Sequence, residues 1–573
     1  VFESDNAADI KRHIIQNNIY GVDIEKGAVD IARLRFWLAL IIDEKEPMPL
    51  PNLDFKIMQG NSLLESYKGV DLSQMQNEVK RGESVRIKGR RSKQIVVSKP
   101  ELALVFDEKD ALKNIQDLVK KYFDITDHQE RDECRNQINH YIKDYIKKCG
   151  PAIADEVDEL EIPNSQFFLW HTYFADVFEN GGFDIVIGNP PYNEVRDLEK
   201  KLQDEYKHSL YYEQAKGGRL NLFQFFYPLG LHIVKSLGIC SFITQNSILG
   251  EESAKGNRKM IFEDCQVLKV DSFPERDNVK LRIFESVKMS VAILLLRKQD
   301  NITSDVFTVD VWKDKYMSSK STLAISKQDI INVYPDELIV PICDNQRWLL
   351  LAKMRNVETY SINAQAGEID MTKFKEQFIH DKSAYRVVTG AQVLRYRITD
   401  SPSQGDVIYL PKISLSANRE IAFNQKRIVM QRITGVDSKI RIIATLLPAK
   451  IYCANSTNYI CESSNPIDMY YLLGILNSKS INFFFKQTST NTNVTSKEIA
   501  KLPIPTNERG IKAVGDVVKE ALELKKKQAD TTSLENQIDF LVYHLYGLTY
   551  DEVLIVDPNP PFTREEYGAY KGE

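Results

Sequence analysis

The sequence predicts an α/β fold: a doubly wound sheet, then a mixed α/β region, then a helical C-terminal segment. Strand-like and helix-like patterns alternate over the first 300 residues, as repeated βαβ units require. Two of the strand-like runs, 239–244 and 289–296, are apolar and β-rich enough to be central strands. The chain has 573 residues, 43% of them hydrophobic, which is enough for about three or four domains.

The N-terminal segment predicts the first βαβ unit. Apolar residues at helical spacing indicate a helix at 7–17, and the run at 19–24 indicates a short buried strand. A nearly continuous apolar stretch at 28–42 predicts a helix packed on a sheet, followed by a strand at 55–58. A turn at 60–62 ends this unit.

The region 78–160 interrupts this alternation of strands and helices, and its pattern predicts a helical insertion. Its first part, 80–93, is rich in Lys and Arg and predicts a basic loop. Residues 111–148 are charged with a helical period, which is typical of a helical hairpin. The sheet then resumes with a strand at 183–188.

A helix at 222–237 and the two central strands complete the first domain, whose limits we place at residues 1–300. Beyond it, short strands alternate with polar turns, so the region 303–505 predicts a second domain of mixed α/β structure. Helical periodicity returns in the segment 506–573, with an amphipathic helix at 534–545.

Composition excludes several classes of protein. The seven cysteines include no CxxC pair, and no His stands at zinc-finger spacing, so we expect reduced thiols with neither a disulfide framework nor a metal site. No apolar run approaches the roughly 20 residues that span a bilayer, so we expect no membrane partner. The N-terminus has no signal-peptide pattern, and together these features predict a cytoplasmic protein.

The most distinctive motif is Asn189-Pro190-Pro191-Tyr192, directly after the strand predicted at 183–188. Ligands bind at the carboxyl ends of strands in open α/β sheets. A Pro-Pro turn after a strand is the simpler interpretation, but it explains only the prolines. The two prolines also hold the backbone extended, which fixes the Asn carboxamide relative to the Tyr ring.

A fixed carboxamide beside a fixed aromatic ring suits one chemical task. The Asn189 side chain and the Pro190 carbonyl can accept hydrogen bonds from an exocyclic amine, preparing its nitrogen to attack an electrophilic methyl group. Tyr192 can stack on the base, which must first leave its duplex. We therefore expect Asn189, Pro190, Pro191 and Tyr192 to be catalytic, with Tyr192 also serving in base stacking.

The string FDIVIGNPPY at 183–192 resembles the catalytic motif of the DNA adenine-N6 methyltransferases. The order of the surrounding segments is similar to their gamma class, as found in type IIG restriction–modification enzymes, and the resemblance runs from Ile19 to Arg297. It implies a Rossmann-like methyltransferase sheet followed by a target-recognition domain. It also implies a site-specific, adenine-specific DNA methyltransferase that moves a methyl group from S-adenosyl-L-methionine to a flipped-out adenine of double-stranded DNA.

The same resemblance assigns residues to cofactor binding. The string YGVDI looks like the family's second cofactor strand, so Asp23 would bind the ribose hydroxyls, with Ile24 beside it. Asn61 and Ser62 stand in the segment similar to the one that contacts the cofactor adenine, although an Asp is frequent at the position of Asn61. Pro191 completes the cofactor-binding set.

A later segment, 283–291, resembles the one whose aromatic residue packs on the flipped adenine, a role that falls on Phe284. Asn221-Leu222-Phe223 resembles the opening of the family's next helix. Simpler interpretations exist: Asp23 as an acid at a helix N-terminus, Asn61 as a turn residue and Phe284 as a core residue. The order of these segments around the motif favours the functional roles.

One element of the family is absent from the sequence. Its Gly-rich loop lets the backbone approach the methionine part of the cofactor, yet no Gly precedes Gly21. We expect the first strand and this loop to lie upstream of Val1, so that the chain is N-terminally truncated. We therefore expect these 573 residues to bind S-adenosyl-L-methionine weakly or not at all.

The expected recognition domain is more basic than the whole chain. Residues 331–510 contain 22 Lys and Arg against 16 Asp and Glu, whereas the net charge of the chain is −5. Such an excess suits a surface that faces phosphates, although charge also segregates by chance in a large protein. The residues expected to bind DNA are Arg395, Arg397, Arg427 and Arg432.

Several alternatives stay open at this point. NPPY-type motifs also serve the amines of RNA and of protein glutamine, although the appended domain and the length of the chain favour DNA. The chain can be a catalytically inert DNA-recognition subunit, or it can be coupled to a nuclease domain upstream of Val1 or to a nuclease subunit in trans. Asp54-x-Lys56 and Asp437-x-Lys439 are isolated triplets of a kind that is common by chance, so they do not by themselves indicate a nuclease.

Overall fold

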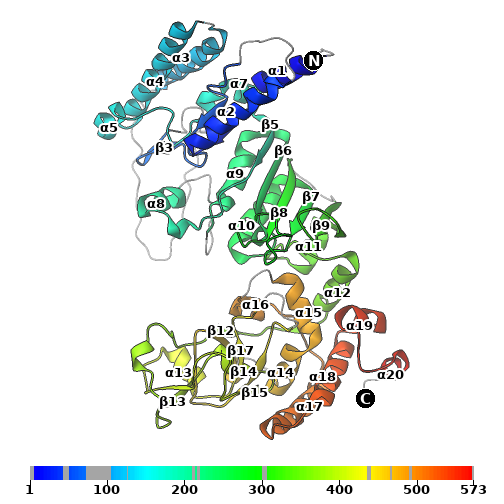
Figure 1. Cartoon of the computed structure of the whole chain (residues 1–573). Coiled ribbons are helices and arrows are strands. Elements are labelled where there is room, and N and C mark those ends of the chain that lie inside the picture. The colour runs from blue at the N-terminus through cyan, green and yellow to red at the C-terminus, as the bar shows by residue number, and fades with distance from the viewer. Residues whose placement is uncertain are drawn as a thin grey trace. The chain divides into compact units, whose positions relative to one another are not determined.

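Contacts divide the chain into two compact units, residues 1–242 with 297–299 and residues 243–296 with 300–573 (Figure 1). The predicted basic loop at 80–93 and the 437–439 triplet lie outside the described residues. The computed structural model describes residues 6–42, 51–72, 105–125, 127–208, 213, 215, 220–299, 306–434, 440–464, 467–489 and 493–570.

The N-terminal segment forms the predicted βαβ unit. Its elements are α1 (Ala7–Asn17), β1 (Gly21–Asp23), α2 (Lys26–Ile41) and β2 (Ile57–Gln59). β1 and β2 pair in parallel with Asp23 opposite Gln59, and α1 and α2 lie side by side (Figure 1). Phe55 was expected to begin the second strand, but its φ of 56° places it in a turn, so β2 starts at Ile57.

The starts of three strands are tied together. The Tyr20 hydroxyl donates a hydrogen bond to Asp176 (2.6 Å), and Lys56 Nζ donates one to the Tyr20 hydroxyl (2.6 Å). The Tyr20 ring meets the Phe183 ring edge-on, with 5.5 Å between centroids. Tyr20 precedes β1, Lys56 precedes β2 and Phe183 begins β5, so one polar and aromatic cluster anchors all three strands.

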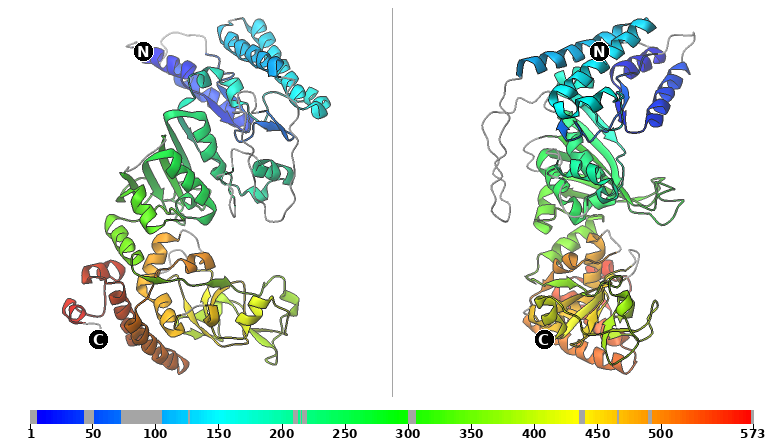
Figure 2. Two further views of the ribbon diagram at one scale, coloured as in Figure 1. Left: turned by 180° about the vertical axis from the view of Figure 1, so that it is seen from behind. Right: turned by 90° about the vertical axis from the view of Figure 1, so that its left-hand side faces the viewer.

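The predicted insertion is a helical hairpin of α3 (Val105–Asp124) and α4 (His128–Cys149), seen side by side in Figure 2. Asp127 caps α4 by accepting hydrogen bonds from the backbone N–H groups of Gln129 and Glu130. The neighbouring short elements are β3 (Ser66–Tyr67), β4 (Val70–Asp71), α5 (Ala154–Asp158), α6 (Trp170–Tyr173), α7 (Ala175–Glu179) and α8 (Lys200–His208).

The central sheet has six strands in the order β10-β9-β7-β8-β6-β5. β5 and β6 run parallel, as do β7 and β9, whereas β10 is antiparallel to β9. This mixed α/β architecture confirms the predicted fold class, and β6 and β8 are interior strands as expected. The strands and their helices are β5 (Phe183–Gly188), α9 (Phe223–Ile233), β6 (Val234–Gln245), α10 (Lys255–Asp264), β7 (Cys265–Phe273), β8 (Val291–Lys298), β9 (Val306–Trp312) and β10 (Lys320–Ser326).

Helix α9 is shorter than the sequence predicts. The expected helix extended to Leu237, but α9 ends at Ile233 and Val234 begins β6. Val234 pairs with Phe183 of β5 and is 1% exposed. Burying this β-branched side chain in the sheet outweighs the helical periodicity of the local sequence.

Short strands and helices make up the rest of the second unit, as predicted. Four strands pair in the order β12-β20-β17-β18, and three in the order β16-β13-β19. The elements are α11 (Lys327–Val333), α12 (Asn345–Arg355), β11 (Thr359–Tyr360), β12 (Ala364–Ala366), β13 (Tyr385–Val388), β14 (Val393–Leu394), β15 (Arg397–Ile398), β16 (Ile408–Leu410), α13 (Ala417–Phe423), β17 (Arg427–Gln431), β18 (Ala444–Leu447), β19 (Tyr452–Cys453), β20 (Thr457–Cys461), α14 (Met469–Asn477), α15 (Lys479–Thr488), α16 (Ser496–Ala500) and β21 (Ile504–Pro505).

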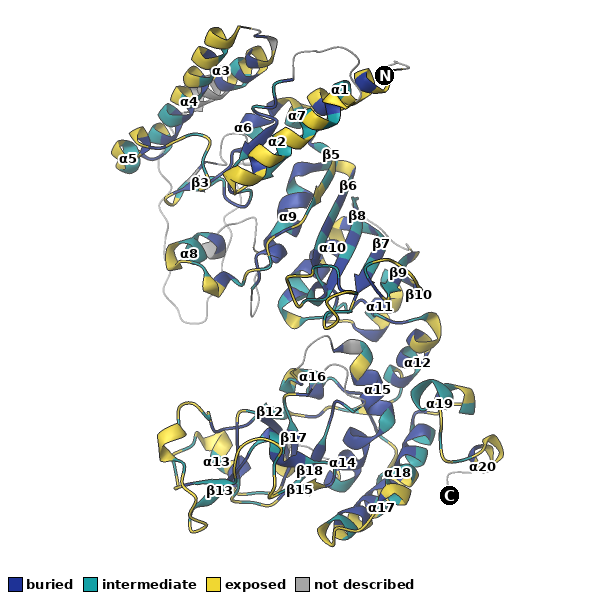
Figure 3. Ribbon diagram, viewed as in Figure 1, coloured by how far each residue is buried: buried dark blue, intermediate teal, exposed yellow. Residues whose placement is uncertain are grey.

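The C-terminal helices are α17 (Glu508–Lys526), α18 (Thr532–Leu545), α19 (Tyr550–Val556) and α20 (Arg564–Ala569). This confirms the predicted helical segment. Only one side of α17 and α18 is buried (Figure 3), as expected of amphipathic helices. Gly474 of α14 lets α17 approach closely, because a Cβ there would stand 2.6 Å from Val514 Cγ1.

One buried carboxyl makes the stability of this unit depend on pH. Asp539 of α18 is 3% exposed, and burial raises the pKa of its carboxyl to about 6. A raised pKa means that stability is greatest below the unfolded-state pKa and falls as the pH rises through about 6. We expect the free energy of unfolding of Asp539→Asn, relative to that of the parent, to rise by roughly 1 kcal/mol from pH 5 to pH 8, measured by denaturant unfolding. Parallel pH profiles would contradict this expectation.

Candidate active site

The Asn189–Tyr192 motif follows β5 immediately and therefore lies at the carboxyl end of a parallel strand. Asn189 and Pro191 are exposed, Pro190 is buried and Tyr192 is half-buried. Burial raises the pKa of the Tyr192 hydroxyl to about 12, so this group is neutral at physiological pH. The motif thus presents an accessible carboxamide close to a partly buried, uncharged aromatic ring.

Two residues at the start of α9 hold Tyr192. Asn221 Nδ2 donates a hydrogen bond to the Tyr192 carbonyl (2.6 Å). The Phe223 ring stands edge-on to the Tyr192 ring, at 6.5 Å between centroids and 86° between planes. The sequence indicated that these residues begin a helix, but it gave no sign that the helix start contacts the motif.

The residues expected to hold a cofactor lie where β1 and β2 end. Asp23 is exposed, and its Oδ1 accepts a hydrogen bond from the backbone N–H of Glu25 (2.8 Å). The Gly60 N–H donates to the Asp23 carbonyl (2.9 Å), and Gln59 Nε2 donates to the Ile24 carbonyl (3.1 Å). The structure therefore brings the Asp23-Ile24 pair next to the turn that carries Asn61 and Ser62.

The Asn61 side chain is used within the protein. It is 5% exposed, its Oδ1 accepts from the Leu63 N–H (3.1 Å), and its Nδ2 donates to the Tyr206 hydroxyl (3.2 Å). The adjacent Ser62 carbonyl accepts a hydrogen bond from Trp170 Nε1 (3.0 Å). Asn61 and Ser62 therefore help to fix the turn itself, as the simpler interpretation of Asn61 as a turn residue suggests. Their bonds to the distant Tyr206 and Trp170 are what local sequence spacing does not reveal.

Phe284 belongs to the second compact unit, in the stretch between β7 and β8 that contains neither helix nor strand. It is half-buried, and its carbonyl accepts a hydrogen bond from the Val287 N–H (3.4 Å). The expected packing of Phe284 on the same base as Tyr192 stays a prediction.

Arg427 is not available to DNA. Its side chain is fully buried, and its Nη1 contacts both carboxylate oxygens of Glu368 (3.1 and 3.2 Å). Its guanidinium also lies over the Tyr459 ring, 4.7 Å from the centroid. The expectation that Arg427 binds DNA is wrong, because this charge is paired inside the core of the β12-β20-β17-β18 sheet.

The other three arginines expected to bind DNA differ in their exposure and in their contacts within the protein. Arg395 has a side chain only 20% exposed, pairs with Glu535 (2.8 Å) and donates to the Asn477 carbonyl (2.9 Å). Arg432 is partly exposed and donates to the Asn455 carbonyl, while Arg397 is exposed. Arg397 and Arg432 are thus the members of the expected set with accessible charge.

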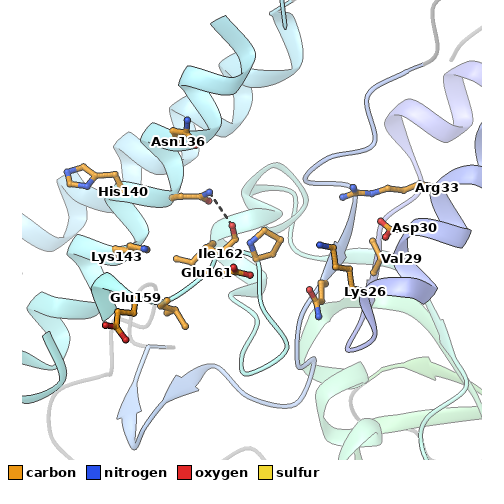
Figure 4. Close-up of a pocket in the computed structure, with 14 residues that line it drawn as sticks. Lys26, Val29, Asp30, Arg33, Asn136, His140, Lys143, Glu159, Glu161 and Ile162 are labelled. Carbon is orange, nitrogen blue, oxygen red and sulfur yellow. Dashed lines mark hydrogen bonds between the residues drawn. The ribbon is translucent and has the colours of Figure 1, made fainter. Parts of the chain in front are cut away.

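A pocket of about 650 Å³ opens between α2 and the α4 region of the first unit (Figure 4). Charges of both signs line it, with Lys26 and Arg33 on α2 and Glu159 and Glu161 on the facing segment. Neither Asp23 nor Asn61 is among its lining residues. Among the described residues, no group of three His, Cys, Asp or Glu side chains could hold a metal ion.

Two regions of the chain match known protein families. Residues 17–279 match the Eco57I restriction-modification methylase family, and residues 385–504 match the TaqI-like C-terminal specificity domain. The chain thus has a region similar to restriction-modification methylases, followed by a region similar to a specificity domain. The expected cofactor and catalytic residues lie in the region that matches the methylase family, and Arg395, Arg397 and Arg432 lie in the region that matches the specificity domain. Phe284 lies outside both matched regions.

A curated protein of Methanocaldococcus jannaschii, RM.MjaORFECS2P, whose name describes a type II restriction enzyme and methyltransferase, is 25% identical to the chain over 602 residues. The match covers 94% of this chain and 49% of that protein. The chain thus spans about half the length of this relative.

Solved structures of restriction–modification enzymes are also similar. The type IIL enzyme MmeI in complex with DNA is 12% identical, with a TM-score of 0.44 and coverage of 76% of this chain and 64% of MmeI. The type IIG restriction endonuclease BpuSI is 12% identical, with a TM-score of 0.28 and coverage of 64% and 54%. No described helix is both long and apolar enough to cross a membrane.

Proposed function

We propose that the polypeptide is a site-specific, adenine-specific DNA methyltransferase of a restriction–modification system, of the gamma class. It would transfer a methyl group from S-adenosyl-L-methionine to N6 of a flipped-out adenine. The observation that carries this proposal is the exposed Asn189 carboxamide at the carboxyl end of β5, inside the region that matches restriction-modification methylases.

In this proposal the motif prepares the adenine amine for attack. Asn189 Oδ1 and the Pro190 carbonyl accept hydrogen bonds from N6, which orients its lone pair toward the methyl donor. Tyr192 stacks on the extruded base through its uncharged ring. Phe284 is proposed to cover the other face of that base.

The residues at the carboxyl ends of β1 and β2 suit a cofactor that contains a ribose and an adenine. When bound, S-adenosyl-L-methionine supplies the electrophilic methyl group. The exposed Asp23 carboxylate suits a ribose diol, which offers two hydrogen-bond donors. Ile24, Ser62 and Pro191 remain proposed contacts. Asn61 would contribute through its backbone, because its amide group already bonds Leu63 and Tyr206.

We also propose that a further strand and a Gly-rich loop, from polypeptide N-terminal to these residues, complete the cofactor site. Exposed apolar surface supports this. Ile185 and Ile187 of β5, at the end of the sheet order, are 62% and 76% exposed. On α2, the apolar residues Ile31, Leu34 and Leu38 are exposed at helical spacing. Figure 3 shows that much of α2 is exposed.

Calorimetry tests this part of the proposal. Titration with S-adenosyl-L-methionine should show saturable binding to the polypeptide extended at its N-terminus and little or none to residues 1–573. Equal binding by both would remove the need for an added segment. No binding by either would favour the alternative of an inert DNA-recognition subunit.

We propose that the specificity region, residues 303–505, contacts double-stranded DNA, with Arg397 and Arg432 as phosphate or base contacts. Both retain accessible charge, and the region is basic. In the same division of the chain, residues 1–300 form the methyltransferase domain, with 78–160 inserted, and residues 506–573 form the helical C-terminal segment. We also propose a cytoplasmic location, because the seven cysteines include no CxxC pair and their pattern indicates no disulfide framework.

A coupled nuclease is the second candidate function, and one observation favours it. The relative whose name includes a restriction enzyme is about twice as long as the match. We propose that a nuclease domain or subunit acts together with this chain. The longer polypeptide should then cleave unmethylated DNA in the presence of magnesium. It should not cleave DNA that it has already methylated.

Methylation-aware sequencing tests the main proposal. DNA incubated with the extended polypeptide and S-adenosyl-L-methionine should acquire N6-methyladenine within one recurring sequence. Methylation at cytosine, or none in the presence of bound cofactor, would contradict adenine-specific transfer.

A further inference from the structure

Asn221 joins the segment after the catalytic motif to the start of α9. Its Nδ2 donates to the Tyr192 carbonyl (2.6 Å), and its Oδ1 accepts from the Phe223 N–H (3.4 Å). Its backbone N–H donates to Gln224 Oε1 (2.7 Å). The residue is 9% exposed, so water competes little for these bonds.

Backbone hydrogen bonds reinforce the same connection. Glu194 and Asn221 form an antiparallel bridge, and the Leu222 N–H donates to the Asn193 carbonyl (2.9 Å). The chain is therefore held on both sides of the motif, by β5 before Asn189 and by this bridge after Tyr192. Between these anchors the two prolines leave little backbone freedom.

The ring of Tyr192 is constrained by the same helix start. Phe223 is 1% exposed and its ring stands edge-on to the Tyr192 ring, an arrangement that aromatic pairs prefer. Asn221 thus fixes the backbone carbonyl of Tyr192 while Phe223 supports its side chain.

We infer that Asn221 is a positioning residue, which holds Tyr192 so that its ring meets the flipped base while Asn189 meets the amine. This inference rests on the proposed function. Asn221 touches neither the base nor the cofactor in this scheme, and it acts only through the hydrogen bond to the Tyr192 carbonyl.

Two substitutions separate this hydrogen bond from the packing of the side chain. Asn221→Asp keeps the size of the side chain and the oxygen that accepts from Phe223, but an ionised carboxylate cannot donate to the Tyr192 carbonyl. A protonated carboxyl can donate, so lowering the pH should restore the bond. Asn221→Ser is too short to make this bond at any pH and carries no titratable group.

With the extended polypeptide, we expect Asn221→Asp at pH 8 to lower kcat about tenfold, with the KM for DNA changed less than about twofold. Activity relative to the parent should recover as the pH falls toward 5.5. Asn221→Ser should lose a similar amount without recovery. With 2-aminopurine at the target position, fluorescence reports the fraction of flipped base. Its intensity should be lower with both variants than with the parent.

Amide hydrogen exchange gives a readout that does not depend on methyl transfer. The peptide covering 189–198 should exchange faster in both variants than in the parent, while peptides from α18 should not change. Parental kcat and unchanged exchange in Asn221→Asp would overturn the inference. A lost kcat without pH recovery, accompanied by faster exchange throughout the first unit, would assign Asn221 a merely structural role. An inactive parent with faster local exchange in the variants would contradict the proposed function but not the anchoring of Tyr192.

Discussion

Asn189→Ala in the extended polypeptide should reduce kcat for adenine methylation by at least about 10³-fold. The carboxamide supplies an acceptor to the amine as its nitrogen becomes the nucleophile, and Ala has no polar group to replace it. The exposed position of Asn189 means that its removal leaves no cavity in the core, so folding and DNA affinity should change little. Methyl transfer from radiolabelled S-adenosyl-L-methionine and DNA binding by fluorescence anisotropy measure the two effects separately.

Asn193→Ala is the matched control for this experiment. Asn193 is also an exposed asparagine near β5, and the Leu222 N–H donates to its backbone carbonyl, a contact that Ala keeps. Its substitution should leave kcat within about twofold of the parent. Substantial methyl transfer by Asn189→Ala would refute the mechanism proposed for the motif. This conclusion would not depend on the proposed cofactor and DNA contacts.

Arg427→Met should destabilise the domain that contains the β12-β20-β17-β18 sheet by about 3–5 kcal/mol. The substitution leaves the Glu368 carboxylate buried and without its guanidinium partner. Glu368 also accepts the Cys453 N–H (3.0 Å), so it cannot turn to solvent without breaking a second bond. Denaturant unfolding followed by circular dichroism measures the loss.

If the unpaired charge of Glu368 causes this loss, then removing that charge should restore stability. Adding Glu368→Gln to Arg427→Met should recover a large part of the stability, because Gln is neutral and keeps an oxygen for the Cys453 N–H. Arg397→Met, at an exposed arginine of the same domain, should change stability by less than about 0.5 kcal/mol. A loss below about 1 kcal/mol in Arg427→Met would show that the ion pair contributes little.

The N-terminal half of the fold was predictable because its signals are local. A strand followed at once by Asn-Pro-Pro-Tyr was read correctly as β5 and its end, and the helical period of 111–148 correctly indicated the α3–α4 hairpin. Helix ends were less predictable. Val234 continues the apolar pattern of α9, and only its pairing with Phe183 shows that it belongs to a strand.

The candidate site divides in the same way. The sequence alone determined the α/β class, the position of the Asn189–Tyr192 motif after β5 and the position of Asp23 at a strand end, because each depends on residues close together in the chain. Tertiary structure decided that Arg427 is a core residue, that the Asn61 amide bonds Tyr206, and that Asn221 reaches Tyr192. These partners lie 59, 145 and 29 positions apart. Whether a polar side chain faces solvent or a buried partner depends on such distant contacts, and residue type and local periodicity carry no record of them.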